Sequence, residues 1–331
     1  MPEPRLDVLA IGNAIVDVIA AADDDFLIRE GLPKGSMRLI DAAEATRLYG
    51  QMAAGREISG GSAANTVAGI AMLGGRAGFV GQVADDQLGE VFSHDIRAMG
   101  VEFATQPMAC EEPTARCLIL VTPDAQRTMN TFLGAAQHLP PAALDERQVR
   151  DAAILYLEGY LWDPLEPRAA MKRAIEIAHD AGRKVAFTLS DAFCISRHKD
   201  GFNGLIDDGS LDILFANEVE ILALTGAADF EAAVAQVSAK LPLLVVTRGE
   251  QGAIAIRGSE RVEVAAEPID KVVDTTGAGD LFAAGFFAGL TRDRPLEDCL
   301  RMGAIAAAEV ISHYGARPEA DIKALVAARL G

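Results

Sequence analysis

Short apolar runs alternate with longer segments of helical period along most of the chain. Six runs rich in apolar and β-branched residues are expected to be strands: residues 6–11, 77–82, 154–157, 185–189, 213–216 and 243–247. Four segments have the length and spacing of helices: residues 63–73, 88–99, 167–181 and 230–240. Several strands are apolar throughout, which indicates burial on both faces. The pattern predicts a doubly wound, mostly parallel α/β sheet flanked by helices, with further packed helices in the alanine-rich region near the C-terminus.

Two regions depart from this alternation because no crossover helix is expected in them. Residues 16–21 with 36–40, and residues 116–121 with 128–133, are expected to be pairs of strands joined by turns. Hairpins fit poorly inside a parallel sheet, so they predict a small, mostly antiparallel β-sheet lid at the edge of the main domain. The alternative is a pair of edge hairpins that only extend the main sheet.

The length of 331 residues allows one large core or roughly two domains, and the composition is that of an ordinary globular protein. The large α/β domain is predicted to contain residues 1–12, 42–112 and 134–331. The lid is predicted to contain residues 13–41 and 113–133.

The chain is strongly acidic. Lys and Arg total 30 against 48 Asp and Glu, which gives a net charge of −18. Such a charge repels nucleic acids and anionic lipid surfaces, so neither is an expected partner. No apolar stretch approaches the ~20 residues of a membrane span, and the N-terminal region lacks signal-peptide features, so a cytoplasmic location is expected.

The cysteines and histidines do not suggest a metal site. The four cysteines lack a paired Cys-x-x-Cys spacing: Cys110, Cys117, Cys194 and Cys299. The five histidines show no close pair at a metal-ligand spacing. Incidental or buried thiols are the better interpretation of the cysteines, rather than a disulfide framework or a zinc site.

The most informative stretch is the string Asp-Thr-Thr-Gly-Ala-Gly-Asp at residues 274–280, which leads directly into an apolar run. It predicts a glycine-rich turn that opens a helix. The first N–H groups of a helix lack intrahelical partners and lie at the positive end of its dipole, so they suit a phosphate or transition-state charge. Asp280, in the first turn, could accept a proton from an attacking hydroxyl. The alternative is an acidic residue that only complements the helix dipole.

Two other phosphate-binding motifs are excluded. The chain has no Gly-x-x-x-x-Gly-Lys-Ser/Thr sequence of a Walker-type loop. Gly277 and Gly279 begin a dinucleotide-like pattern, but Phe282 occupies the third glycine position and the motif lies far from the first βα turn.

Two weaker motifs lie nearer the N-terminus. The string Gly-Gly-Ser-Ala-Ala-Asn at residues 60–65 precedes a helix, where small residues let a ligand approach and Asn65 can hydrogen-bond it. A capped helix with tight glycine packing explains this string equally well. The first strand ends in Gly12 and Asn13, and Asp17 follows on the next extended segment, where it could bind two ligand hydroxyls. A solvated turn acid is the alternative.

Two strands of the predicted sheet end in polar residues. The string Asn-Glu-Val-Glu at residues 217–220 follows the strand at 213–216, at the sheet edge where α/β proteins bind ligands. Asn217 and Glu220 suit the water shell of Mg²⁺, and a helix N-terminus with early acidic residues is an equal alternative. Residues 247–249 form a similar strand-to-loop turn that could face a nucleotide.

In this order, the elements resemble the ribokinase or PfkB family of carbohydrate and nucleoside kinases, and the resemblance spans the chain. Residues 274–280 are close to the family's C-terminal signature, and residues 60–65 resemble its N-terminal one. The resemblance implies a large α/β domain that binds nucleotide and substrate, a β lid, and phosphorylation of a primary alcohol by ATP with Mg²⁺. It also implies a monovalent-cation site, for K⁺, near Asp274.

The resemblance assigns roles to individual residues. Asp280 is implied to be the catalytic base beside an anion hole formed by Gly277, Ala278 and Gly279. Sugar hydroxyls are implied to lie near Asn13, Asp17, Gly60, Gly61, Ser62 and Asn65. Mg²⁺-bound waters are implied to be ordered by Asn217 and Glu220. The ATP cleft is implied to include Asn217, Thr247, Arg248, Gly249, Thr275, Gly277, Gly279 and Gly303.

Within the family, residues 12–17, 189–193 and 212–218 look most like those of adenosine kinases. The residues expected to contact a purine are Ile15, Tyr160 and Phe193. Two departures stand out, because Asp191 lies where adenosine kinases usually have a small or apolar residue, and Gly303 replaces an Asn that ribokinases place near adenine.

The predicted reaction is transfer of the γ-phosphate of ATP to the 5′-hydroxyl of a ribonucleoside, with adenosine as the expected acceptor and AMP and ADP as products. One alternative is a kinase of a free sugar such as ribose or a ketose. Another is a binding protein without turnover, although Asp280 and both glycines of the anion hole are intact. A monomer or homodimer is expected, with ATP and a small-molecule substrate as its ligands.

Overall fold

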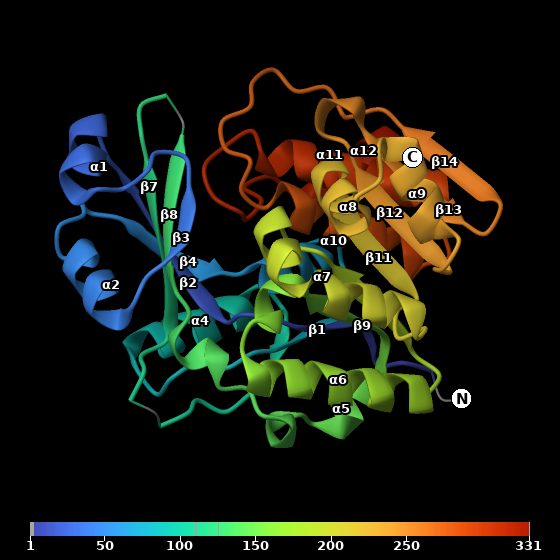
Figure 1. Cartoon of the computed structure of the whole chain (residues 1–331), viewed down its shortest axis with the longest axis horizontal. Coiled ribbons are helices and arrows are strands. Elements are labelled where there is room, and N and C mark those ends of the chain that lie inside the picture. The colour runs from blue at the N-terminus through green and yellow to red at the C-terminus, as the bar shows by residue number, and fades with distance from the viewer. Residues whose placement is uncertain (1–2, 110, 125, 331) are drawn as a thin grey trace.

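The computed structural model describes residues 3–109, 111–124 and 126–330. Within these ranges, nine strands form the main sheet, in the order β14-β13-β12-β11-β10-β9-β1-β5-β6 (Figure 1). Neighbouring strands from β6 to β12 are parallel, and β13 and β14 are antiparallel additions at one edge. The strands are β1 (Leu6–Ile11), β5 (Ala77–Val80), β6 (Glu102–Phe103), β9 (Ala152–Glu158), β10 (Lys184–Thr188), β11 (Ile213–Asn217), β12 (Leu243–Thr247), β13 (Ala253–Arg257) and β14 (Glu260–Val264).

Helices cover both faces of this sheet, because successive apolar residues of each strand point to opposite sides. In β12, Leu243 and Val245 belong to one core cluster, while Leu244 and Val246 belong to the other. The first cluster includes α3 (Ser62–Met72), α4 (Gln87–Ala98), α10 (Ala278–Leu290), α11 (Leu296–Val310) and α12 (Ile322–Leu330). The second includes α5 (Glu146–Arg150), α6 (Leu165–Asp180), α7 (Ala192–Asp207), α8 (Glu218–Thr225) and α9 (Phe230–Ser238). The predicted doubly wound fold is confirmed.

A second sheet stands beside the large one (Figure 1). In the described part of the chain it has five strands, in the order β3-β8-β7-β2-β4. They are β2 (Ile15–Ala21), β3 (Met37–Leu39), β4 (Arg56–Gly60), β7 (Ala115–Val121) and β8 (Arg127–Phe132). Helices α1 (Asp24–Glu30) and α2 (Ala42–Tyr49) belong to the same region. The second sheet is separate from the main one, so the alternative of edge hairpins that only extend the main sheet is wrong.

The internal pairing of the lid differs from the prediction. The antiparallel hairpin of β7 and β8 is confirmed. The predicted hairpin of residues 16–21 with 36–40 is wrong, because α1 lies between these segments and β3 pairs in parallel with β8. The side chain of Asp23 caps α1 by accepting a hydrogen bond from Phe26 N at 2.7 Å. Strand β2 pairs in parallel with β7 and antiparallel with β4, so the lid is a mixed sheet rather than a mostly antiparallel one.

The lid also includes part of the segment 42–112 that the predicted division gave to the large domain. Strand β4 pairs with β2, and α2 packs against β7 and β8. The other predicted domain boundaries stay predictions. Among the described residues, no single helix is long and apolar enough to cross a membrane, and the bent pair α8 and α9 passes that test by length and composition alone.

The cysteines in the described ranges, Cys117, Cys194 and Cys299, are buried free thiols, as expected. Burial raises the pKa of Cys117 to about 12, so its thiolate form is strongly disfavoured. Cys110 lies outside the described residues.

Candidate active site

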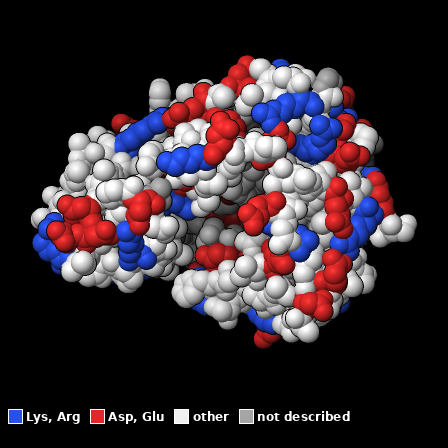
Figure 2. All heavy atoms as spheres, turned by 90° about the horizontal axis from the view of Figure 1, so that it is seen from above, with Lys and Arg blue, Asp and Glu red and all other residues white. Residues whose placement is uncertain are grey.

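A cavity of about 400 Å³ lies between the lid and the carboxyl ends of the main strands. Seen from above, the molecule is hollowed between these two parts, and acidic side chains gather around the hollow (Figure 2). Most of the predicted site residues line the cavity: Asn13, Ile15, Asp17, Gly61, Ser62, Asn65, Tyr160, Phe193, Asn217, Glu220, Thr247, Thr275, Gly277, Ala278, Gly279 and Asp280. The fold therefore brings together motifs that are more than 200 residues apart in the sequence, such as Ser62 and Asp280 (|i−j| = 218).

The string at 274–280 forms the predicted turn and helix start. Gly277 is the N-cap of α10 with φ 77°, a left-handed conformation that favours glycine. A Cβ on Gly277 would lie 2.8 Å from the Cβ of Ala316, so the position also lacks room for a side chain. No side chain of the described residues caps α10. The first turn of the helix therefore presents backbone N–H groups to the cavity, as an anion site requires.

Asp280 is held by the string Gly-Gly-Ser-Ala-Ala-Asn at residues 60–65, which we call the second glycine motif. Its two carboxylate oxygens accept hydrogen bonds from Ser62 Oγ at 2.6 Å and from Asn65 Nδ2 at 2.9 Å. Burial raises the pKa of Asp280, while these two hydrogen bonds and the charge of Arg317 act against the rise. The Oδ1 atom of Asn65 is buried and has no hydrogen-bond partner among the described residues, and Asn65 lines the cavity. A substrate hydroxyl is the kind of donor that this oxygen lacks.

Asp17 reaches the cavity from the lid strand β2 and is only 6% exposed. Burial raises its pKa to about 7, with Arg317 opposing the rise and Asp280 and Asp274 adding to it. Gly60, predicted to contact substrate, does not line the cavity. A Cβ there would lie 2.3 Å from Asp17 Oδ2, so Gly60 provides the space that Asp17 occupies.

Glu158 is a site residue that the sequence reasoning missed. It ends β9 and is completely buried, and it accepts hydrogen bonds from Asn13 N at 2.7 Å, Asn13 Nδ2 at 2.9 Å and Ala63 N at 2.7 Å. Burial raises its pKa to about 7 despite these donors. Glu158 therefore ties the end of β1 to the start of α3. Its signal in the sequence is an acidic residue directly after the apolar run 154–157.

Arg127 is a second missed residue, and it connects the lid to the glycine-rich loop. From β8, its Nε lies 2.8 Å from Asp274 Oδ1, and it also donates hydrogen bonds to Thr275 Oγ1 and Thr276 Oγ1. Asp274 additionally accepts hydrogen bonds from Thr276 N at 2.8 Å and Gly315 N at 2.9 Å. The guanidinium thus places a lid cation directly beside the start of α10.

Asn217 and Glu220 form a reciprocal capping box at the start of α8. Asn217 Oδ1 accepts from Glu220 N at 2.9 Å, and Glu220 accepts from Asn217 N at 3.0 Å and from Asn217 Nδ2 at 2.6 Å. Burial raises the pKa of Glu220 to about 7. A carboxylate has about four lone-pair sites, so Glu220 can cap the helix and still accept a hydrogen bond from a metal-bound water. The two readings of this motif are compatible, and the Mg²⁺ role stays a prediction.

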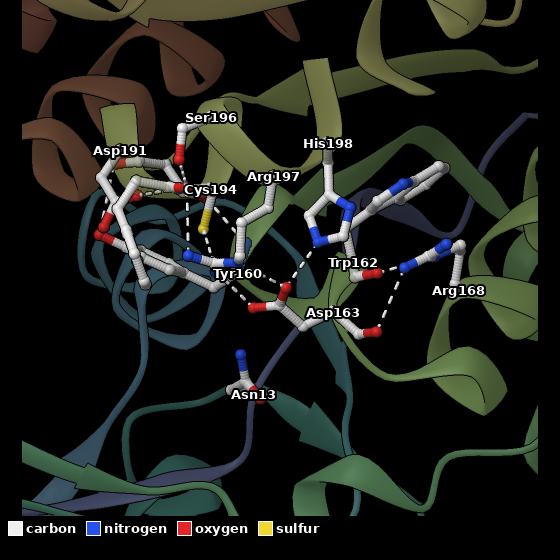
Figure 3. A network of polar contacts seen from close by, with 12 residues as sticks. Asn13, Tyr160, Trp162, Asp163, Arg168, Asp191, Cys194, Ser196, Arg197 and His198 are labelled. Carbon is white, nitrogen blue, oxygen red and sulfur yellow. Dashed lines mark hydrogen bonds and ion pairs between the residues drawn. The ribbon is translucent and has the colours of Figure 1, made fainter. Parts of the chain in front are cut away.

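The start of α7 lines the cavity with Phe193, Cys194 and Arg197. Figure 3 shows the polar contacts around Cys194, Arg197 and Asp163. Phe193 is 55% exposed, and the guanidinium carbon of Arg197 lies 3.8 Å from its ring centre. Asp163 accepts from Arg197 Nε at 2.9 Å and Nη2 at 2.5 Å, and His198 Nε2 lies 2.5 Å from the same carboxylate. Asp191, the residue that departs from the adenosine kinase pattern, caps α7 by accepting from Cys194 N at 2.6 Å.

Three residues predicted for the ATP cleft do not line this cavity. Arg248 pairs with Glu218 at 3.1 Å and lies over the ring of Phe230. Gly249 begins a short 3-10 turn just beyond the strand end. Gly303 lies where α11 packs on α10, and a Cβ there would come within 2.7 Å of Phe282 O. The structure therefore gives Gly303 a packing role.

Residues 34–323 match the pfkB family of carbohydrate kinases, which is most of the chain. The chain belongs to this pfkB family. It is 50% identical to the adenosine kinase from Sinorhizobium meliloti, with a TM-score of 0.92 over 98% of this chain and 99% of that one. It is 47% identical to a probable sugar kinase from Rhizobium etli CFN 42, with a TM-score of 0.93 over 98% of both chains.

A sugar-acid kinase is also similar to this pfkB kinase. The 5-dehydro-2-deoxygluconokinase of Shouchella clausii is 29% identical over 97% of this chain and 96% of that protein. The predicted enzyme class is confirmed, since the family transfers phosphate to hydroxyl groups of nucleosides or sugars. Kinases of this family use ATP, typically with Mg²⁺.

Replacing Asp17 with Asn should stabilise the kinase at high pH. The pKa of Asp17 is raised in the folded protein, so its favourable contribution is complete below the unfolded value and is lost as the pH rises through about 7. Thermal unfolding should show a higher Tm for the variant at about pH 8.5, and the difference should shrink steadily as the pH falls and become small at about pH 3.5. The gain is at most a few kcal/mol, because each unit of pKa is worth about 1.4 kcal/mol. The exposed Asp207→Asn is the control, and an equal gain there would contradict the assignment.

Proposed function

We propose that this kinase transfers the γ-phosphate of ATP to the 5′-hydroxyl of a ribonucleoside, with adenosine as the acceptor. The observation that carries the proposal is the position of Asp280. Its carboxylate lies in the first turn of α10, beside the N–H groups that follow Gly277, and is fixed by Ser62 and Asn65. A proton acceptor and an anion-binding helix end therefore face the same cavity, as transfer of a phosphoryl group to a hydroxyl requires.

The reaction follows from these groups. The acceptor hydroxyl donates a hydrogen bond to Asp280, which takes its proton as the oxygen attacks the γ-phosphorus. Negative charge on the transferred group is stabilised by the N–H groups at the start of α10, over Gly277, Ala278 and Gly279. Arg127 adds a positive charge from the lid beside this loop, through its contacts with Thr275 and Asp274.

The same cavity offers groups for the rest of a nucleoside. Asp17 accepts hydrogen bonds from the two ribose hydroxyls, and the unpartnered Oδ1 of Asn65 accepts another. The base lies against an apolar wall to which the lid and α7 both contribute: Ile15, Met37, Leu39, Cys117, Ile119, Leu133 and Phe193. This apolar area favours a nucleoside over a free sugar, because a sugar offers hydroxyls to every side.

ATP and Mg²⁺ fit the opposite end of the cavity. Thr247 and Thr275 line it near the ends of β12 and the loop before α10, and Asn217 and Glu220 lie at the start of α8. Glu220 would accept hydrogen bonds from waters of the metal, and Asn217 would hold Glu220 in place. The bound Mg²⁺ would neutralise phosphate charge.

Replacing Asp280 with Asn should lower kcat by about 10²- to 10⁴-fold, because the amide cannot accept the proton. The shape and the contacts with Ser62 change little, so ATP should bind the variant with a similar Kd. Steady-state ADP release and ATP titration measure the two quantities. Turnover near the wild-type rate would show that Asp280 is not the base.

Replacing Phe193 with Ala tests the acceptor. Loss of a base-stacking ring costs about 1–3 kcal/mol, so kcat/KM for adenosine should fall about 5- to 150-fold while that for ribose changes little. Phe193→Tyr keeps an aromatic face and serves as the control. A wild-type enzyme that prefers ribose or another free sugar over adenosine would overturn the nucleoside assignment and leave the kinase assignment intact.

Replacing Glu220 with Gln should raise the Mg²⁺ concentration needed for half-maximal activity by several-fold, because a charged acceptor for the metal's waters is lost. Glu218→Gln removes a neighbouring charge from the same helix start, and Glu218 does not line the cavity, so it is the matched control. Identical Mg²⁺ titrations for wild type and Glu220→Gln would leave Glu220 with its helix-capping role alone.

A further inference from the structure

Arg317 lies outside the cavity and has no part in the reaction described above. It follows α11 in the chain, is partly buried, and reaches the other side of the second glycine motif. Its Nε and Nη2 donate to Ser59 O at 3.2 and 3.0 Å, its Nη2 also donates to Ser59 Oγ at 2.9 Å, and its Nη1 donates to Ala64 O at 3.0 Å. One guanidinium therefore fastens both ends of the segment 59–64.

This short segment positions the two carboxylates on which the proposed reaction depends. Gly60 is in contact with Asp17, and Ser62 donates a hydrogen bond to Asp280, followed by Asn65 just beyond the segment. Ser59, the first residue of the segment, has a further partner besides Arg317, because its N–H donates a hydrogen bond to Asp95 Oδ2 at 2.8 Å. A displacement of this backbone would therefore disturb the contacts of Asp17 and those of Asp280 at the same time.

Arg317 also brings positive charge to an acidic region. Burial lowers its pKa to about 10, while Asp95, Asp17 and Asp280 favour its charged form. In return, the charge of Arg317 favours ionisation of both Asp17 and Asp280. Other groups act electrostatically on these two carboxylates or are affected by them: Arg127, Asp274, Cys117, Tyr156, Glu158 and Tyr160. Apart from Arg127, the groups in this list are acids or weak acids, whose anionic forms disfavour another negative charge nearby.

We propose that Arg317 is a positioning residue for the kinase reaction: its guanidinium holds the segment 59–64, which supports Asp17 and Asp280, and it brings a positive charge to this acidic region. The role rests on the proposed function in one respect, namely that Asp280 is the base. It does not depend on which hydroxyl compound is the acceptor. If Arg317 acted only by hydrogen bonding to the backbone, a neutral donor at the same position could replace it. The experiment therefore has to test the positive charge of Arg317.

The test compares Arg317→Gln, Arg317→Met and Arg317→Lys with wild type, using kcat/KM measured across about pH 5.5 to 9.5 for the best acceptor of the wild-type enzyme. The acidic limb of this profile reports the coupled ionisation of the carboxylates in the free enzyme. Without the charge, the limb should move up by about one pH unit, which is about a tenfold loss at low pH that recovers as the pH rises. Arg317→Lys should keep the limb near its wild-type position.

Arg292→Met is the matched control, because Arg292 also donates to two backbone carbonyls, of Ala288 and Leu73. It should alter Tm without moving the acidic limb. If Arg317→Met does not fold, Arg317→Gln still removes the charge while it keeps donors for the carbonyls. Limbs that coincide in wild type and the neutral variants would overturn the proposal, as would equal shifts in the Lys and Gln variants.

Failure of the proposed function has a different signature. Full turnover by Asp280→Asn would remove the base assignment whatever the Arg317 variants do. Loss of adenosine as the preferred acceptor would change only the substrate used in the assay. An unmoved acidic limb in an enzyme that needs Asp280 contradicts the role of Arg317 alone.

Discussion

Asp17, Glu158, Glu220 and Asp280 all line one cavity, and each gives up much of its hydration there. The removal of carboxylates from water is costly unless donors or positive charges replace the lost solvent. The compensation differs from one carboxylate to the next. Glu158 receives three N–H donors, Glu220 two, and Asp280 a hydroxyl and an amide. For Asp17 the opposing influence is charge, chiefly that of Arg317, and its side chain lines the cavity.

The cations that balance this acidic cavity come from distant parts of the chain. Arg127 lies on the lid strand β8, and Arg317 lies in the segment after α11. Neither could act on these carboxylates before the lid, the glycine loops and the C-terminal segment have come together. The electrostatic state of the site is therefore coupled to the position of the lid, since movement of β8 would take Arg127 away from Asp274.

The sequence predicted the features that depend on local pattern. The apolar runs predicted most strands of the main sheet, and the string at 274–280 predicted both the glycine-rich turn and the place of Asp280 in the first turn of α10. The prediction of a hairpin from residues 16–21 and 36–40 was wrong because the acidic residues that begin helix α1, with Asp23 as its cap, are also typical of a turn. Glu158, Arg127 and Arg317 could not be found in this way, because each acts through partners 95 to 258 positions away. Gly60 and Gly303 were assigned to ligands, yet their importance lies in the space that they leave.

The loop before α10 and the start of α7 both line the cavity, and each is held by contacts of its own. Asp280 is fixed by contacts from α3 at the start of α10, whereas Phe193 and Arg197 lie in the part of α7 that precedes His198. That part is set apart from the rest of α7 by the non-helical backbone at His198, and Asp163 holds it through both Arg197 and His198. These contacts involve neither Asp280 nor its partners Ser62 and Asn65, so a substitution in this clamp would alter the α7 side of the cavity first. Under the proposed function, Phe193 would share the choice of acceptor with lid residues such as Ile15 and Leu39, which line the same cavity.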